Sequence, residues 1–286
     1  MNLNDRALLV QLSISQWMGR KLDKKASKSV TDDAGASRDA ARVHKTLLPG
    51  CDELSNVHSM TNVIRTKFYD NTLPWGLDGM QVLPSSNYLA YSTDYRKDRN
   101  DWYSLVSTFL GAYEIAKWNA ENDKRHTLGA LYVPTDYPTA KELEQKFSMD
   151  LAIFPVPSTD FRVQIASEEL TRIQQDVEAR VAKAQSVAMQ EVWQRLFDKV
   201  KHIADKCADP KAIFRDTMIE NARELCELLP RLNITDDPNL EALRLEVESK
   251  LIHHPDAIRN NPDLRRDTAT EAKKIMDAMG VFMGAN

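Results

Sequence analysis

Long hydrophobic runs are missing from this sequence, and glycine is missing from most of its second half. No stretch of 18 apolar residues occurs, so no membrane-spanning helix is predicted. None of the nine glycines falls between residues 130 and 279, whereas all eight tyrosines lie between Tyr69 and Tyr137. Turns are therefore expected in the first half of the chain, and helices joined by proline and Asp/Asn turns in the second.

Cysteine is scarce as well, and the charges do not favour one sign. The three cysteines, Cys51, Cys207 and Cys226, lie far apart in the sequence. This pattern is typical of a reduced intracellular protein with buried thiols. The N-terminus lacks the basic segment and apolar run of a signal peptide. We therefore expect a cytoplasmic protein, in the host cytoplasm if a phage encodes it, with no membrane partner.

Sequence motifs that indicate an enzyme or a metal site are absent. The six histidines and three cysteines show no C-x-x-C, H-E-x-x-H or H-x-H spacing. The sequence also lacks a phosphate-binding loop, a dinucleotide-binding glycine motif and a G-x-S-x-G elbow. No reaction class is indicated. We therefore expect a non-enzymatic protein with no catalytic residues, no metal and no cofactor.

The strongest pattern in the chain is a long helix over residues 167–208. Neither proline nor glycine interrupts this stretch, and apolar residues recur along it about every 3.7 positions. The repeat consists of Leu170, Ile173, Val177, Val181, Ala184, Ala188, Val192, Leu196, Val200 and Ile203. Such a stripe must pack lengthwise against something, and another segment of the same chain is favoured over self-association.

These divisions predict an α+β fold that is rich in helices. A head domain over residues 1–166 contains a small sheet, residues 167–208 form the long amphipathic helix, and residues 209–286 form a helical C-terminal domain. Within the head, alternating residues predict a strand near 10–14, and helices are expected near 34–47, 52–69 and 101–122. Further strands are expected at 128–133 and 161–165.

Aromatic and basic residues cluster in the head in a way that is typical of single-stranded nucleic-acid binding. Cations follow phosphates, and aromatic faces stack on bases. The candidate nucleic-acid-binding residues are Trp17, Arg20, Lys21, Lys24, Lys25, Tyr95, Arg96, Lys97 and Arg99. Two alternatives stay open. Trp102, Tyr113 and Trp118 are also explained as the core of an amphipathic helix, and the basic cluster over residues 20–28 as a solvated or disordered loop.

Several short motifs resemble a family of uncharacterised phage and bacterial proteins. They are Leu73-Pro74-Trp75, Asp78-Gly79 with Leu83-Pro84, Asp136-Tyr137-Pro138, and Phe154-Pro155-Val156-Pro157 leading to Asp160-Phe161-Arg162. The likeness covers roughly residues 5 to 205. It implies an α/β head that leads into a long helix, a phage-like cytoplasmic setting, and a partner among the MoxR-type AAA ATPases that are often encoded nearby. It implies no activity.

Two functions follow as hypotheses. In the first, the protein is a non-enzymatic, oligomeric binder of single-stranded DNA that acts in phage replication or recombination. In the second, it is a helical oligomeric scaffold or adaptor that holds copies of itself, a AAA ATPase or another protein partner.

Overall fold

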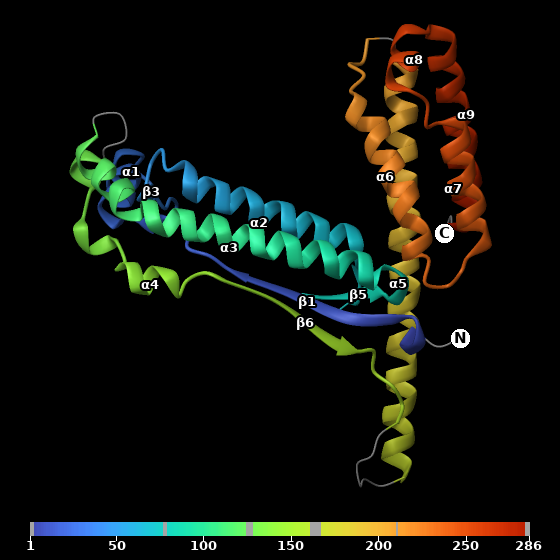
Figure 1. Ribbon diagram of the computed structural model, residues 1–286, viewed down its shortest axis with the longest axis horizontal. Coiled ribbons are helices and arrows are strands. Elements are labelled where there is room, and N and C mark those ends of the chain that lie inside the picture. Colours follow the sequence, from blue (N-terminus) through green and yellow to red (C-terminus); the bar gives the residue numbers. More distant parts are fainter. Residues whose placement is uncertain (1–2, 77–78, 124–127, 161–166, 210, 284–286) are drawn as a thin grey trace. The chain divides into compact units, whose positions relative to one another are not determined.

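The computed structural model describes residues 3–76, 79–123, 128–160, 167–209 and 211–283, and it confirms a helix-rich α+β fold (Figure 1). One compact unit comprises Met1–Gln11, Phe68–Tyr91 and Ala152–Asn286, and the other comprises Leu12–Lys67 and Ser92–Leu151. We call them unit 1 and unit 2. The elements β1, α2, α3 and β6 contribute residues to both.

All of the described strands precede α5, and the described elements from α5 onward are α-helices. The strands are β1 (Ala7–Ser15), β2 (Arg20–Leu22), β3 (His44–Thr46), β4 (Leu73–Pro74), β5 (Met80–Pro84) and β6 (Ser148–Pro155). The α-helices are α1 (Lys24–Asp33), α2 (Asp52–Asn71), α3 (Ser85–Asn122), α4 (Ala140–Glu144), α5 (Ser167–Ala208), α6 (Asp216–Leu232), α7 (Pro238–Lys250), α8 (Pro255–Asn260) and α9 (Pro262–Phe282). Short 3₁₀ turns cover Leu3–Asp5, Gly129–Leu131 and Pro134–Asp136.

The main sheet has four strands in the order β4-β5-β1-β6. β1 pairs antiparallel with β5, from Ala7 opposite Pro84 to Gln11 opposite Met80. β4 also pairs antiparallel with β5, so the strands on either side of residues 77–78, which lie outside the described residues, form a hairpin. Gly79 has a φ of +75°, which glycine adopts at little cost.

In unit 1, α5 has the bounds that the sequence predicts. Along its second half the apolar stripe is buried, and Val192, Leu196, Val200 and Ile203 are fully inaccessible to solvent. These side chains share one core with residues of α6, α7 and α9. Figure 1 shows α6, α7 and α9 beside this half of the helix. The partner expected within the same chain is therefore present for the stripe from Ala184 onward.

In unit 1, two arginines donate hydrogen bonds to the carbonyl groups at the C-terminal ends of helices. Arg195 of α5 donates from Nη1 to the carbonyl oxygen of Asp70 (2.8 Å) and from Nη2 to those of Tyr69 (3.0 Å) and Thr72 (2.9 Å). The last carbonyls of a helix have no partner within the helix, and a cation is favourable beside them. Arg195 therefore fixes the end of α2 on α5.

Arg265 of α9 does the same at the end of α5. Its Nη2 donates to the carbonyl oxygens of Lys206, Asp209 and Ala212, at 2.7, 2.6 and 3.2 Å. The turn that follows α5 is thus bound to α9, which packs beside it.

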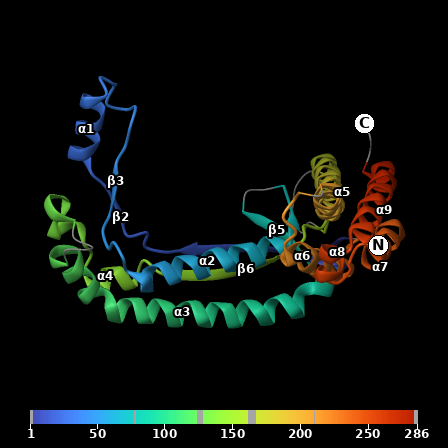
Figure 2. The same cartoon turned by 90° about the horizontal axis from the view of Figure 1, so that it is seen from above.

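Unit 2 has an aromatic core between α2 and α3, which lie side by side in Figures 1 and 2. Trp102, Phe109 and Tyr113 of α3 are fully buried. The indole Nε1 of Trp102 donates to Thr61 Oγ1 of α2 at 2.8 Å, so its one polar atom is satisfied. For Trp102 and Tyr113, the interpretation as core residues is the one that the structure supports.

Three of the predicted elements need comment. The helix expected at 34–47 is wrong: the helix here is α1, ten residues earlier, and Asp23 caps it. The strand expected at 128–133 is also wrong, because a 3₁₀ turn occupies half of this segment, a second follows it, and Leu131 and Val133 are exposed. The strand expected at 161–165 lies outside the described residues.

We expect the substitution Arg195→Met to destabilise the protein by about 1.5–3 kcal/mol, because it leaves three carbonyl groups without their charged donor. Urea unfolding followed by circular dichroism measures this loss. The control is Arg223→Met, which removes an exposed arginine that pairs with Glu220 across 3.8 Å. The control should change the free energy of unfolding by less than about 0.5 kcal/mol. Equal losses in both variants would contradict the role given to Arg195.

Candidate nucleic-acid interface

Residues 20–46 of unit 2 form a basic arm made of β2, α1 and β3. This segment carries eight Lys/Arg and four Asp residues, a net charge of +4 in a chain whose net charge is −4. β2 and β3 pair antiparallel, with Arg20 opposite Thr46, Lys21 opposite Lys45 and Leu22 opposite His44. Figure 2 shows α1, β2 and β3 extending away from α2 and α3. The arm is therefore a concentrated positive charge on a protruding structure.

The arm's helix is set by a cap rather than by apolar packing. Asp23 Oδ1 accepts hydrogen bonds from the backbone N–H groups of Lys25 (3.0 Å) and Ala26 (2.9 Å). Lys24 and Lys25 stand in the first turn, where the helix dipole disfavours positive charge. Their presence there does not help α1 to form. Both side chains are exposed, so they are available to an anionic ligand.

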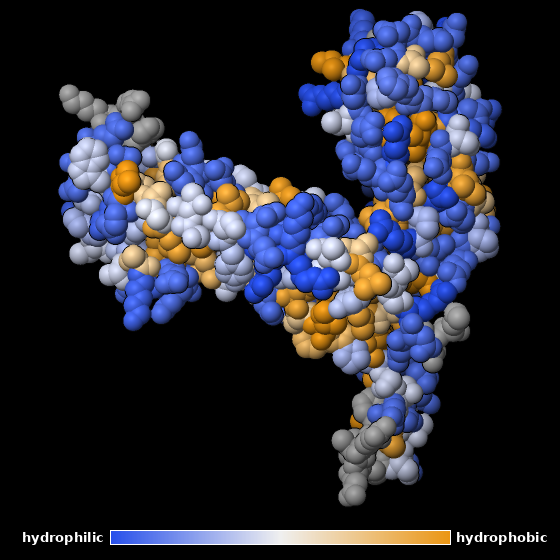
Figure 3. All heavy atoms as spheres, viewed as in Figure 1, coloured by the Kyte–Doolittle hydropathy of each residue, from blue (hydrophilic) through white to orange (hydrophobic). Residues whose placement is uncertain are grey.

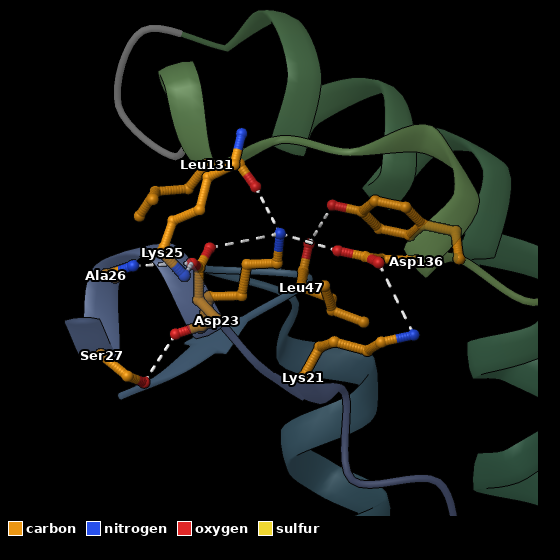
Figure 4. Close-up of polar contacts among 10 residues, drawn as sticks. Lys21, Asp23, Lys25, Ala26, Ser27, Leu47, Leu131 and Asp136 are labelled. Carbon is orange, nitrogen blue, oxygen red and sulfur yellow. Dashed lines mark hydrogen bonds and ion pairs between the residues drawn. The ribbon is translucent and has the colours of Figure 1, made fainter. Parts of the chain in front are cut away.

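A buried lysine anchors the arm (Figure 4). The Lys45 side chain is 5% exposed, and its Nζ lies 2.7 Å from Asp136 Oδ2 and 3.7 Å from Asp23 Oδ2. Nζ also donates to the carbonyl oxygen of Leu131 at 2.6 Å. One ammonium group thus joins β3, the cap of α1 and the turns before α4. A lysine held by three oxygen atoms has a structural role.

A second contact closes the same junction. The Tyr137 hydroxyl donates to the carbonyl oxygen of Leu47, one residue beyond β3, at 2.7 Å. Burial raises the pKa of Tyr137 above its ordinary value, so the hydroxyl stays a donor at any physiological pH. The base of the arm is therefore rigidly connected to the 128–137 segment.

The pKa of the capping carboxylate is lowered. The backbone N–H of Ala26 is the main cause and the Lys45 ammonium adds to it, against the opposing effect of desolvation. Because the folded pKa of Asp23 lies below the unfolded one, ionised Asp23 stabilises the folded arm above about pH 4. That contribution is lost as the pH falls through the lowered pKa. The arm is thus held in place throughout the neutral range.

The predicted arm residues differ in how far they reach solvent. Arg20, Lys24 and Lys25 are exposed, and so is Lys28, one turn further along α1. Lys21 is 53% exposed, but its Nζ lies 3.6 Å from Asp136 Oδ1. Its charge is therefore partly neutralised. The alternative of a disordered loop is wrong, because the segment forms two strands and a capped helix.

Trp17 lies just before the arm and is half-buried. Its ring stacks on Phe109, with 6.1 Å between centroids, and meets the edge of Tyr113 at 6.0 Å. His58 Nε2 lies 3.1 Å from the Trp17 carbonyl oxygen. Trp17 is thus held at the margin of the aromatic core, and it is not a free stacking surface.

The second predicted cluster lies on α3. Arg96 and Lys97 are exposed, whereas Arg99 donates to the carbonyl oxygen of Met149 (3.3 Å) and lies over the Tyr103 ring. Tyr95 is 9% exposed, and burial raises its pKa to about 12. The expectation that Tyr95 is available for stacking is therefore wrong. Its ring belongs to the buried stripe of α3.

The two clusters are not brought together. Arg99 is tied to β6, whereas the arm is tied through Lys45 to Leu131, close to where the N–H of Leu128 donates to the carbonyl oxygen of Ala120. Positions 99 and 120 of α3 are 21 residues apart in sequence, which corresponds to about 31 Å along the helix. The nine predicted residues therefore do not form one groove, and the arm is the stronger candidate.

An exposed aromatic residue does lie at the arm's end of α3. Trp118 is 61% exposed, so its assignment to the core is wrong. Lys117, its neighbour, lies over the ring of Tyr137, the residue that bonds to the end of β3. Helical spacing could have predicted that Trp118 is exposed. Position 118 does not lie on the buried stripe of α3, which runs through positions 102, 109 and 113.

Other kinds of site find no support in the described parts of the chain. No three His, Cys, Asp or Glu side chains converge there as metal ligands would. In the same residues, no helix is both long and apolar enough to span a bilayer. Comparison with protein-family models, with curated proteins and with solved structures finds no match.

We expect Lys45→Met to destabilise the protein by about 3–5 kcal/mol, because it leaves Asp23 and Asp136 without the buried cation that they share. Chemical unfolding followed by tryptophan fluorescence measures this loss. The double variant Lys45→Met, Asp136→Leu removes one of the two carboxylates, so it should recover part of the loss. A loss below about 1 kcal/mol in the single variant would argue against the anchoring role.

Proposed function

We propose that this chain is a non-enzymatic protein that binds single-stranded nucleic acid through the basic arm of unit 2. The observation that carries the proposal is the exposed positive charge of residues 20–46, fixed in place by the buried Lys45. The resemblance to phage and bacterial proteins suggests a phage-like setting, and replication or recombination is where we propose that such a protein would meet single-stranded DNA.

The chemistry of the arm supports binding to a phosphate backbone. Four of its exposed cations, Arg20, Lys24, Lys25 and Lys28, come from a strand and a helix that one cap joins. Lysine side chains are long and act as point charges, so they can contact the phosphates of a flexible strand whatever its bases are. We therefore expect weak dependence on sequence and strong dependence on salt.

Trp118 supports a single-stranded rather than a duplex ligand. An exposed indole face stacks on an unpaired base of any sequence, whereas the bases of a duplex are already stacked. Trp118 lies in the last turns of α3, the helix whose end contacts the 128–137 segment that anchors the arm. Exposed cations and an exposed aromatic residue thus both support the proposal, with Trp118 in place of Tyr95.

The alternative function, a helical scaffold for a AAA ATPase or another protein, depends on α5 in unit 1. It uses none of the residues of the arm. The two activities are therefore separable by mutation, and one does not exclude the other.

The first test is a salt titration of binding to a fluorescent oligonucleotide by fluorescence anisotropy. Affinity should fall by about 0.7 log units per log unit of salt for each phosphate neutralised. The substitutions Lys24→Glu, Lys25→Glu and Lys28→Glu together should abolish binding at moderate salt. Lys21 is left out because Asp136 already partly neutralises it.

Two variants control this test. Lys201→Glu, Arg223→Glu and Lys273→Glu make the same change in net charge at exposed positions of unit 1, and they should leave binding nearly unchanged. Arg96→Glu with Lys97→Glu tests the second cluster, which should contribute little. If the unit 1 variant loses as much affinity as the arm variant, only the overall charge matters and the arm is not the site.

Trp118→Ala tests the stacking contribution. Affinity for the oligonucleotide should fall by about 1–3 kcal/mol, roughly 5- to 150-fold, with the salt slope unchanged because no phosphate contact is lost. Quenching of tryptophan fluorescence on binding should weaken in this variant. Tyr69→Ala, which removes a 53% exposed tyrosine of unit 1, is the matched control. An unchanged affinity for Trp118→Ala would leave the arm as a purely electrostatic site.

A further inference from the structure

The first half of α5 carries an apolar stripe that no described part of the chain fully covers. Leu170, Ile173, Val177 and Val181 continue the repeat that is buried further along the helix, but here they are only partly covered. In Figure 1, α6, α7 and α9 do not extend along this half. The one side-chain hydrogen bond described between this half and the preceding segment runs from Gln174 Nε2 to the carbonyl oxygen of Thr159.

A groove lies along the same stripe within unit 1. It has a volume of about 410 Å³, and Trp75, Pro157, Val177, Val181 and Ala184 are among its lining residues. Ile153 and Phe154 of β6 are also more than 40% exposed. Figure 3 shows hydrophobic residues gathered over the strands beside α5. This half of the helix therefore presents an apolar surface with room for side chains of a partner.

Packing of its apolar face would stabilise this segment further. Most of the stability of a helix in a protein comes from such packing rather than from helix propensity. Residues 167–184 span about 27 Å. The same stripe obtains this packing from α6 and α9 in the second half, so an equivalent surface would do the same for the first half.

The charges of this segment fit a second copy of itself in antiparallel orientation. Residues 168–178 carry four acidic residues and one arginine, whereas residues 180–183 carry Arg180 and Lys183. In an antiparallel pair the acidic end of each helix faces the basic end of the other. In a parallel pair like charges face each other. The pairing that sets Glu168 and Glu169 against Arg180 and Lys183 also sets Ile173 of one copy beside Val177 of its partner.

We propose that this protein forms a two-fold symmetric dimer through residues 167–184 of α5, paired antiparallel with the same residues of a second copy. A two-fold interface of this kind is self-complementary and closes at two subunits. The apolar stripe supplies the affinity and the end charges set the orientation. This interface lies outside the arm and does not depend on nucleic-acid binding.

The test uses the full chain in sedimentation velocity over a range of concentrations. The wild type should shift from 32.5 kDa to twice that mass as concentration rises. Arg180→Glu with Lys183→Glu, and separately Glu168→Lys with Glu169→Lys, should each raise the dissociation constant at least about tenfold, because like charges then face each other. Mixing the two variants in equal amounts should restore a dimer. All four positions are exposed, so folding should be unaffected, which circular dichroism checks.

Lys201→Glu with Arg223→Glu is the matched control, since it makes the same change in net charge on exposed positions outside the segment. It should dimerise like the wild type. The proposal is overturned if the wild type stays monomeric at every concentration, which would assign the groove to a different protein. It is equally overturned if the assembly grows beyond two copies, or if the mixed variants dimerise no better than either alone.

Discussion

The Lys45 ammonium group is the constraint on which the candidate site depends. A buried charge is costly unless it is paired and hydrogen-bonded, and Lys45 meets Asp136, Asp23 and the carbonyl oxygen of Leu131. These oxygens come from segments about a hundred residues apart in sequence. The pairing therefore fixes the ends of β2, β3 and α1 against the 128–137 turns, and it leaves the other cations of the arm in solvent. A surface that carries many like charges needs fixed contacts of this kind, because its charges repel one another.

The same rule for buried polar groups explains why some elements were predictable from the sequence and others were not. The second half of α5 buries only apolar side chains along its stripe, so its period was visible and its bounds are as predicted. The first half of α3 buries Asn87, Ser92 and Asp98 in its stripe. Asp98 pairs there with Lys67, and Asn87 donates to the carbonyl oxygen of Asn71. Polar residues at core positions hid the helical period, and the predicted helix began at residue 101 instead of Ser85.

The candidate site was predictable in composition but not in geometry. The arm cations were found because a local excess of positive charge is a property of sequence alone. The helix expected at 34–47 is misplaced because the true cap, Asp23, is followed by two lysines, and positive charge is unfavourable in the first turn of a helix. Tyr95 and Trp118 exchanged roles because their exposure depends on the phase of the whole helix. This phase, meaning which positions of α3 face the core, becomes clear only when the buried positions from 87 to 113 are treated as one stripe.

The two proposed surfaces belong to different units, and together they would change how a strand is held. Under the proposed function, one arm would offer few phosphate contacts, so its affinity would be modest and sensitive to salt. Each copy carries one arm, and pairing through α5 gives an assembly with two. Once one arm binds a long strand, binding of the second arm to the same strand is intramolecular. The effective concentration of the second arm near the strand then takes the place of its concentration in solution. Weak electrostatic sites then bind long strands much more tightly than short oligonucleotides. A preference for length without a preference for sequence is therefore the behaviour that follows from combining the arm with the antiparallel helix pair.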